Sequence, residues 1–312
     1  MTTVFSHSRI TTFEECPKRF EYRYRLKIPV ESEGIEAFVG KRVHEVLERL
    51  YLAAQRGQLP ALDRVLRRYE QLFDENFDPQ RVRVVREQTP IHHYRKLGER
   101  CLSAYYRRHY PFDADETLGI EQRLTFTLDD ARGYRFQGVI DRLARARDGA
   151  IEVHDYKTGR RAATQKQVDE DRQLALYQIG LAEQYPDRPI RLVWHYLQQD
   201  RTLTSTRTPE QLQALRENTI SAVDRINSET EFEPRASALC DWCEYNDRCP
   251  IYPKQGARTP QPPSANPTAT AQPSVPTPTP PRAASVSEAA IAGAREPGQL
   301  ALFAAKSSGE SP

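Results

Sequence analysis

Hydrophobic residues in the first third of the chain recur at spacings of three and four. The clearest run places apolar side chains at Ile35, Phe38, Val39, Val43, Val46, Leu47 and Leu50. This spacing predicts a helix that ends near Gln55, Arg56 and Gly57. The same periodicity predicts two further helices, over residues 61–77 and 88–109. The N-terminal region is therefore expected to be helical.

The pattern changes to strands near Leu118. Strand-like stretches cover residues 119–129, 134–147 and 150–159, and short turns separate them, which predicts an antiparallel meander. The pattern then predicts a helix over 167–185, strands over 190–199 and 202–208, and a helix over 209–228. This order predicts a mixed α/β fold in which helices flank one central sheet.

Composition changes again near Lys254. Residues 255–312 hold 11 of the 23 prolines, interleaved with alanine, serine and threonine. Such a segment buries too little apolar surface to offset the entropy lost on ordering. We therefore expect one folded domain over residues 1–254 and a disordered tail after it.

Charge and hydropathy exclude several classes of protein. The 45 lysines and arginines nearly balance the 43 aspartates and glutamates, so net charge alone does not make the chain a polyanion binder. No apolar run approaches the roughly 20 residues that span a bilayer, and the N-terminus lacks the pattern of a signal peptide. We expect a soluble, cytoplasmic protein without membrane contact, in which local patches make any contact with nucleic acid.

Three short segments are candidates for such patches. Residues 81–86 ("RVRVVR"), 105–110 ("YYRRHY") and 159–161 ("GRR") are basic, and the first two interleave basic with apolar or aromatic residues. This arrangement suits a single-stranded nucleic-acid backbone with stacked bases. Solvated helix faces are the alternative explanation for such segments.

The segment "IEVHDYKTG", residues 151–159, contains an aspartate and a lysine two residues apart. Strand geometry puts Asp155 and Lys157 on one face and Tyr156 on the other. Asp141, at the end of "QGVID" on the preceding predicted strand, is expected beside them. Two such carboxylates suit Mg²⁺ or Mn²⁺, and a lysine can orient or help deprotonate water at the metal. These are the parts that phosphodiester hydrolysis requires, although solvated Asp and Lys pairs are also common on sheets.

Four short motifs accompany this pair in a set order. They are "GKRVHEVLE" (40–48), "GVIDRL" (138–143), "HDYKTG" (154–159) and "QLALY" (173–177). With them the chain resembles the PD-(D/E)XK nuclease superfamily, specifically the RecB-type branch that includes the AddB nuclease and the CRISPR-associated iron-sulfur exonucleases. The proline of the superfamily's name is absent from both "GVID" and "EVHD". The resemblance implies a restriction-endonuclease-like core and a metal-dependent exonuclease that acts on single-stranded DNA ends in repair or recombination.

The resemblance also implies roles for single residues. Asp141 and Asp155 are expected to bind the metal, with the backbone carbonyl of Tyr156 assisting, and Lys157 is expected to act on the water. His44 is implied as a further metal ligand. It lies at the margin of its helix's apolar stripe, where an imidazole projects into a cleft or, alternatively, forms the edge of a packed core.

Two residues of the "QLALY" motif have an implied role in DNA binding. Gln173 and Tyr177 are four apart and share a helix face. The resemblance implies that they help position the DNA and the active site. By pattern alone they are ordinary residues of a helix surface.

Three of the five cysteines crowd into "CDWCEYNDRCP". Cys240, Cys243 and Cys249 form a C-x2-C-x5-C array that is compact enough to surround one metal centre. The resemblance implies that Cys16 is the fourth ligand and that a 4Fe-4S cluster joins the two ends of the domain. Zn²⁺ is the alternative, because four thiolates suit either metal.

An apolar island stands near the end of the tail, at Gln299, Leu300, Leu302 and Phe303. It is similar to the Q-L-x-L-F peptide by which many bacterial repair and replication proteins dock on the sliding clamp, so residues 299–303 are a candidate clamp-binding peptide. An apolar patch without function is the alternative. A helicase partner that supplies unwound DNA is a further possibility for a nuclease of this type.

Two other classes of function are open. The first is a non-catalytic DNA-binding accessory subunit of a repair complex, which would keep the nuclease fold as a clamp or end sensor. The intact set of Asp141, Asp155, Lys157 and His44 argues against it. The second is a cysteine-metal adaptor that bridges proteins, which would not need the strand with Asp155 and Lys157.

Overall fold

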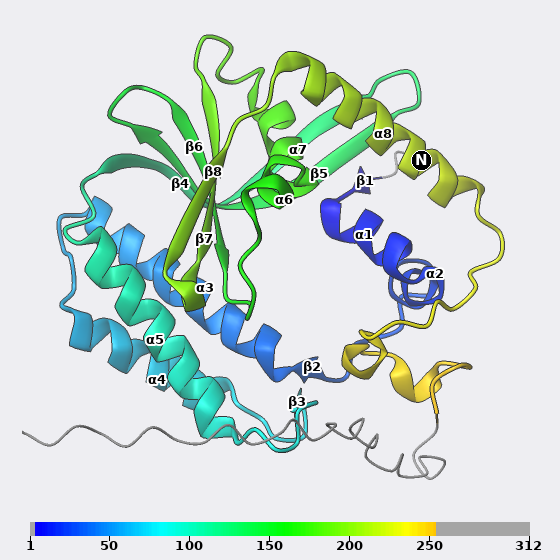
Figure 1. Ribbon diagram of the computed structural model, residues 1–312, viewed down its shortest axis with the longest axis horizontal. Helices are drawn as coiled ribbons and strands as arrows, with labels where there is room; N and C mark the ends of the chain where they lie inside the picture. The colour runs from blue at the N-terminus through cyan, green and yellow to red at the C-terminus, as the bar shows by residue number, and fades with distance from the viewer. Residues whose placement is uncertain (1–3, 254–312) are drawn as a thin grey trace, which may run out of the picture. The chain divides into compact units, whose positions relative to one another are not determined.

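A six-stranded mixed sheet lies at the centre of the computed structural model, which describes residues 4–253 (Figure 1). The strands follow the order β1, β5, β6, β7, β8, and β4 pairs along the length of β5. β1 with β5 and β6 with β7 are parallel, and the other pairs are antiparallel. The strands of this sheet are β1 (Val4–Phe5), β4 (Asp115–Asp129), β5 (Tyr134–Ala146), β6 (Ile151–Lys157), β7 (Ile190–Tyr196) and β8 (Arg201–Ser205). The predicted mixed α/β fold and the meander over β4, β5 and β6 are confirmed.

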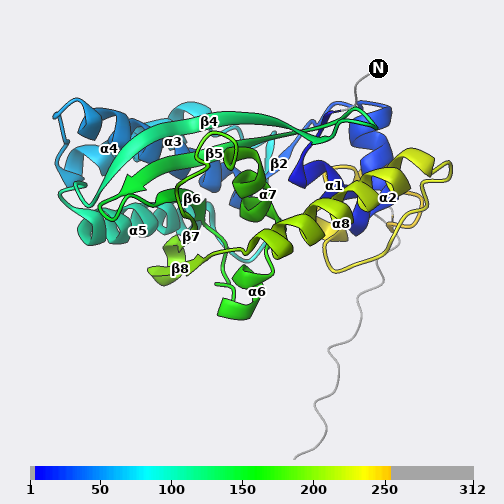
Figure 2. The ribbon, with the colours of Figure 1, turned by 90° about the horizontal axis from the view of Figure 1, so that it is seen from above.

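Helices flank the sheet in two groups (Figures 1 and 2). The first group is α3 (Ile35–Gln55), α4 (Leu62–Asn76) and α5 (Ile91–His109). The second is α1 (His7–Glu15), α2 (Pro17–Phe20) with the π-helical turn η1 (Glu21–Arg25), α6 (Gln165–Asp169), α7 (Arg172–Leu181) and α8 (Pro209–Ser228). Short 3₁₀ turns are η2 (Leu197–Gln199), η3 (Cys240–Trp242) and η4 (Asn246–Arg248), and β2 (Glu33–Gly34) pairs with β3 (Val82–Arg83) in a separate small sheet.

Each group of helices has its own hydrophobic core. The apolar stripe of α3 packs with α4 and α5, as its spacing predicts, and Tyr156 and Leu197 join that cluster. The other cluster lies between the sheet and helices α1, α7 and α8, and it contains Val153 and Trp194. Because side chains alternate along β6, this strand contributes to both cores, with Ile151 and Val153 in one and Tyr156 in the other.

The single helix predicted over residues 167–185 is wrong. The structure has two helices there, α6 and α7, and each has its own N-terminal cap. Thr164 and Gln167 form a capping box on α6, and the carboxylate of Asp171 accepts a hydrogen bond from the backbone N–H of Leu174 on α7. An aspartate that caps a new helix interrupts the one before it, because its side chain binds backbone that helix continuation would use.

Two further predictions concern the C-terminal tail and contact with a membrane. The tail and its candidate clamp-binding peptide, residues 299–303, lie outside the described residues. Within residues 4–253, none of the helices combines the length and apolar character needed to cross a bilayer.

Candidate active site

The candidate site lies where β5 and β6 separate. The two strands pair over Arg142–Arg145 and Ile151–His154, and β1 pairs with the same edge of β5 only at Arg135 and Phe136. Asp141 and Asp155 are the first residues beyond the paired segment. The backbone N–H of Tyr156 donates a 2.8 Å hydrogen bond to Oδ2 of Asp141 rather than to backbone. The fork therefore brings two carboxylates from neighbouring strands together.

Asp155, Lys157 and Gln173 form a closed triangle of contacts. The ammonium of Lys157 lies 2.8 Å from Oδ2 of Asp155 and donates a 3.0 Å hydrogen bond to Oε1 of Gln173. The amide nitrogen of Gln173 donates a 3.1 Å hydrogen bond to Oδ1 of Asp155. The shared face of Asp155 and Lys157 is as strand alternation predicts, and α7 supplies the third member.

The ammonium in this triangle is charged. Burial lowers the pKa of Lys157, but the charge of Asp155 and the contact with it raise that pKa by more, so the net shift is upward. Within residues 4–253, Oδ2 of buried Asp155 accepts no hydrogen bond of good geometry, although the ammonium is close. This oxygen therefore keeps a lone pair available at the fork.

Tyr177 packs against the strand that carries Asp141. A Cβ atom placed on Gly138 would lie 2.2 Å from Cε1 of the tyrosine, so only glycine allows this contact. Tyr177 is buried, with 6% of its surface exposed. The four-residue spacing of Gln173 and Tyr177 thus connects α7 to both arms of the fork, to Asp155 on β6 and to Gly138 on β5.

His44 reaches the fork from α3. Its Nε2 atom lies 2.9 Å from the carbonyl oxygen of Tyr156, and this oxygen can only accept, so Nε2 carries the proton. In the tautomer that carries its proton on Nε2, Nδ1 presents a lone pair. It lies 3.6 Å from Oδ2 of Asp141 and 4.0 Å from Oε1 of Glu121. One ligand atom from each of His44, Glu121 and Asp141 lies within 4.8 Å of the other two.

Glu121 is a site residue that the sequence analysis missed. Its neighbours on β4 pair with the neighbours of Asp141, Ile120 with Arg142 and Gln122 with Ile140. Glu121 itself has a φ of 46°, a left-handed conformation that costs a non-glycine residue about 1–2 kcal/mol. Strained residues of this kind concentrate at functional sites.

A bulge explains why Glu121 faces Asp141. Asp129 pairs with Tyr134 at the end of the hairpin, and an unbroken ladder counted from that pair would set Gln122 across from Asp141. The register shifts by one residue between Thr127 and Asp129. Counting the register from the turn was the available signal in the sequence. Without allowance for the bulge, this count would have placed Gln122 rather than Glu121 across from Asp141.

The electrostatics of the fork favour a bound cation. Burial and the nearby charge of Asp155 raise the pKa of Asp141 to about 8. Burial and the charge of Asp141 also raise the pKa of Glu121. A divalent cation would stabilise the ionised forms of these carboxylates. Carboxylate oxygens with one imidazole nitrogen suit Mg²⁺ or Mn²⁺, so the residues present fit such an ion.

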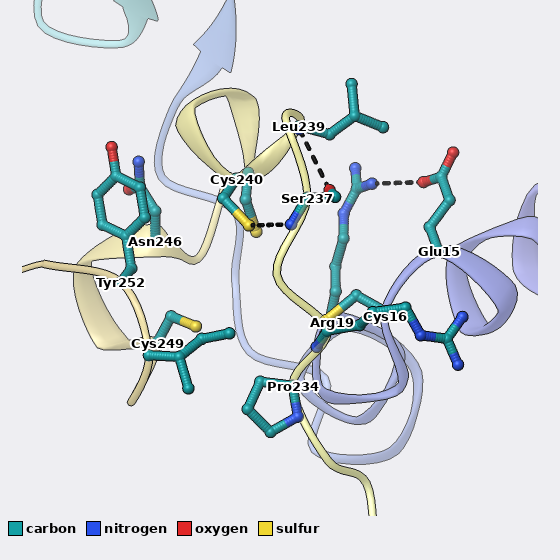
Figure 3. Close-up of a pocket in the computed structure, with 13 residues that line it drawn as sticks. Glu15, Cys16, Arg19, Pro234, Ser237, Leu239, Cys240, Asn246, Cys249 and Tyr252 are labelled. Carbon is teal, nitrogen blue, oxygen red and sulfur yellow. Dashed lines mark hydrogen bonds and ion pairs between the residues drawn. The ribbon is translucent and has the colours of Figure 1, made fainter.

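Four cysteines line a second candidate metal centre, a small pocket between the N-terminal helices and the segment after α8. Cys16, at the end of α1, lies across from the segment that carries Cys240 and Cys249 (Figure 3), and Cys243 also lines the pocket. The backbone N–H groups of Arg235 and Ser237 donate to the sulfurs of Cys16 and Cys240, at 3.5 and 3.3 Å. Such donors stabilise thiolate ligands.

The sulfur atoms are widely spaced. Among the described residues, no three cysteine sulfurs lie within 4.8 Å of one another. Four thiolates around one Zn²⁺ at about 2.3 Å would lie about 3.8 Å apart. The arrangement of the four cysteines is therefore wider than a single-zinc site.

Comparison with known proteins identifies the family. A family model described as the PD-(D/E)XK nuclease superfamily matches residues 4–250, which include both arms of the fork and all four cysteines of the pocket. None of the curated proteins matches the chain. Among solved structures, the one titled "Crystal structure of SSO0001" is similar over 81% of this chain and 89% of its own, with 15% identity and a TM-score of 0.36. On the family match, this chain belongs to the PD-(D/E)XK nuclease superfamily.

Proposed function

We propose that this protein is a metal-dependent exonuclease of the RecB-type branch that degrades single-stranded DNA ends in repair or recombination. Membership of the superfamily supports nuclease chemistry. The observation that carries the proposal is the triangle of Asp155, Lys157 and Gln173 beside Asp141 at the fork. Such an arrangement joins metal-binding carboxylates to a charged lysine that has a fixed position.

Asp141 and Asp155 would hold Mg²⁺ or Mn²⁺ in this proposal. Nδ1 of His44 and the carboxylate of Glu121 are further donors, and the carbonyl of Tyr156 borders the same space. A divalent cation bound here polarises the phosphodiester and makes water more acidic. The carboxylates thus determine where the scissile phosphate lies.

Lys157 has the task of orienting the attacking water and stabilising charge on the phosphate. Its ammonium is fixed by Asp155 and Gln173, so little reorganisation is needed when charge develops. The water oxygen forms a bond to phosphorus in line with the leaving oxygen, and the bond to the leaving oxygen breaks. The attacking water gives up a proton to solvent, and the leaving oxygen takes one from solvent. Gln173 and Tyr177 act in this scheme by holding the fork in shape and by bordering the DNA.

Cleavage of end-labelled DNA tests the proposal. The wild type should shorten single-stranded DNA with Mg²⁺ or Mn²⁺, and Lys157→Ala should lower the rate by about 10²–10⁴-fold. Lys166→Ala is the matched control and should cleave normally, because Lys166 lies on α6 with 83% of its side chain exposed. If the wild type binds DNA but cleaves neither single-stranded nor duplex DNA with either metal, the protein is instead an accessory subunit.

The cysteine pocket is proposed to hold a 4Fe-4S cluster. Its support is the convergence of Cys16 with Cys240, Cys243 and Cys249, and a spacing of sulfurs wider than one Zn²⁺ requires. The role would be structural, since a link between residues far apart in sequence removes entropy from the unfolded chain. It would join the two ends of a nuclease domain over residues 1–254.

Absorption of anaerobically purified protein tests the cluster. The wild type should show a broad visible band, and Cys249→Ser should lose the band and unfold at lower temperature. Cys101→Ala is the control, because Cys101 is buried in α5 away from the pocket and should keep the colour. A colourless wild type with stoichiometric zinc would overturn the assignment.

Partners form the remaining part of the proposal. DNA is the expected substrate, a helicase would supply single strands, and residues 299–303 would tether the cytoplasmic enzyme to a sliding clamp. Deletion of residues 299–303 should abolish clamp binding in a pull-down and leave cleavage unchanged. Unchanged clamp binding would remove that motif from the proposal.

A further inference from the structure

A basic pocket borders the candidate active site. Arg86, from the segment after β3, Arg100, on α5, and Arg160, after β6, line it together with His93. Two of the basic segments noted in the sequence, residues 81–86 and 159–161, therefore meet at one place. The third segment, residues 105–110, does not line this pocket. Its Arg108 forms an ion pair with Asp200 at 2.7 Å.

The pocket begins next to Lys157. Thr158, Gly159 and Arg160 follow this lysine directly along the chain, and all three line the pocket. A Cβ atom on Gly40, one turn before His44 on α3, would lie 3.0 Å from Oγ1 of Thr158. The helix that carries His44 and the loop that follows Lys157 are thus in close contact between the fork and the pocket.

The arginines of the pocket are largely free of protein partners. Within the described part of the chain, the side chains of Arg100 and Arg160 form no hydrogen bond or ion pair. Arg86 is 3.7 Å from Glu36, the single carboxylate among the lining residues. Three guanidinium groups against one carboxylate give the pocket a positive field that favours an anion.

The start of α5 adds to this field. Pro90 is its N-cap and supplies no side-chain hydrogen bond, and the first turn has no acidic residue. Thr89 and His93, on either side of this cap, both line the pocket. The positive end of the helix dipole is therefore not compensated by a nearby carboxylate of its own first turn.

We propose that this basic pocket binds the phosphodiester backbone of the substrate strand next to the scissile phosphate. The inference rests on the proposed nuclease function. In a strand that is cleaved beside Lys157, the phosphates on either side of the scissile phosphate lie one nucleotide further along the backbone. Guanidinium groups bind phosphate oxygens through paired hydrogen bonds and read no base sequence. The pocket thus fixes the register of the strand at the fork without selecting a sequence.

The cysteine segment supports one wall of this pocket. The guanidinium of Arg86 lies 5.7 Å from the ring centre of Trp242, and Arg83 donates hydrogen bonds to Oδ1 of Asn246 and the carbonyl of Cys243, at 3.1 and 3.0 Å. These contacts hold the segment that carries Arg86 against the residues between Cys243 and Cys249. They give the cysteine pocket a physical connection to substrate binding.

Fluorescence anisotropy with labelled single-stranded DNA in EDTA tests the proposal without cleavage. The double variant Arg100→Gln/Arg160→Gln should bind more weakly than the wild type. The slope of log Kd against log salt concentration should be smaller by about 1.4 for this variant than for the wild type. Each phosphate contact to a single strand contributes about 0.7 to that slope. Arg67→Gln, on the exposed face of α4, is the matched control and should bind as the wild type. A double variant with the wild-type Kd and salt slope would overturn the pocket assignment.

A second variant separates this inference from the proposed function. Asp155→Asn should bind the strand in EDTA about as the wild type does and should not cleave it with Mg²⁺. If the wild type cleaves and the double variant binds normally, only the pocket assignment fails. If the wild type binds without cleaving and the double variant loses binding, the pocket assignment is supported while the nuclease function fails. A wild type that binds no strand would overturn the pocket.

Discussion

Two clusters of acidic and histidine residues lie in the region of strands β4, β5 and β6, and only one of them fits a metal. His44, Glu121 and Asp141 form the cluster at the fork, which we call the front cluster. A rear cluster is made by Asp115, Glu152 and His154, and its ligand atoms are equally close together. By residue type alone, both clusters are candidate metal sites.

The rear cluster has its cation supplied by the protein. Arg142 is 1% exposed and donates to both carboxylate oxygens of Asp115, at 2.6 and 3.0 Å, and to His154 at 3.0 Å. Arg191 pairs with Glu152 at 2.5 Å. The guanidinium groups neutralise the carboxylates, so a metal ion would have to displace buried arginine.

Within residues 4–253, no arginine forms an ion pair with the front cluster. Lys157 pairs with Asp155, while Asp141 and Glu121 face each other and His44, and the pKa values of both carboxyl groups are raised. The comparison teaches that an acidic cluster is a good candidate for a metal site only where the protein itself does not supply the compensating positive charge. Adjacent residues, Asp141 and Arg142, fall on the two sides of this distinction.

Exchange of one carboxylate on each side of β6 should give opposite results. Asp155→Asn should lower the cleavage rate by about 10⁴-fold, as loss of an essential group does, and should leave folding intact. Glu152→Gln should keep cleavage and lower the unfolding temperature, since Arg191 loses one of its two carboxylate partners and keeps only Asp148. Cleavage assays and thermal unfolding of both variants check this, and normal cleavage by Asp155→Asn would show that the fork is not the active site.

Removal of the buried guanidinium group of Arg142 should destabilise the folded protein. Arg142→Gln should lower the free energy of unfolding by about 3–5 kcal/mol, because Asp115 remains largely buried without its partner. Urea unfolding measures this. Arg145→Gln is the control on the same strand, where the ion pair with Glu116 is exposed and the loss should be under about 1 kcal/mol. Equal losses in the two variants would contradict the view that Arg142 neutralises the rear cluster.

Glu121 sharpens the comparison on the metal side. Glu121→Gln should weaken Mn²⁺ binding by about tenfold, as loss of a ligand-supporting group does in metal sites, and should not lower stability. Calorimetric titration with Mn²⁺ measures this without DNA. Glu116→Gln, which changes an exposed carboxylate near the start of β4, should bind Mn²⁺ as the wild type does. Unchanged affinity in Glu121→Gln would leave its strained backbone without a role in metal binding.

The smallest effect concerns His154 of the rear cluster and two histidines near it, His195 and His109. Burial lowers the pKa of His154 and His195 well below the ordinary value, and lowers that of His109 to about 4. Unfolded histidines bind a proton near pH 6.5. The unfolded state therefore takes up more protons below that pH, and the free energy of unfolding should fall between about pH 6.5 and 4.

Thermal unfolding at pH 7 and pH 5 checks this loss. His109→Gln should show a smaller drop in unfolding temperature than the wild type. His92→Gln, at an exposed position on α5, should show the full drop. An equal drop in all three proteins would place the acid sensitivity elsewhere.

Local patterns were sufficient for most elements of the fold. The apolar stripe of α3 and the alternation along β6 report backbone periods that hold in any tertiary context. They predicted where α3 ends, the meander, and the common face of Asp155 and Lys157. The failure at residues 167–185 arose because the cap at Asp171 outweighed an apolar pattern that continues across it.

The sequence by itself thus determined the strands, the main helices and the residue types of the nuclease motifs, because these depend on local backbone geometry. Only the tertiary structure decided which groups meet. A one-residue bulge brought Glu121 rather than Gln122 to Asp141, and Arg142 was directed to the rear cluster. Strand register and helix packing set such meetings, and a shift of one residue moves a side chain to the other face of the sheet.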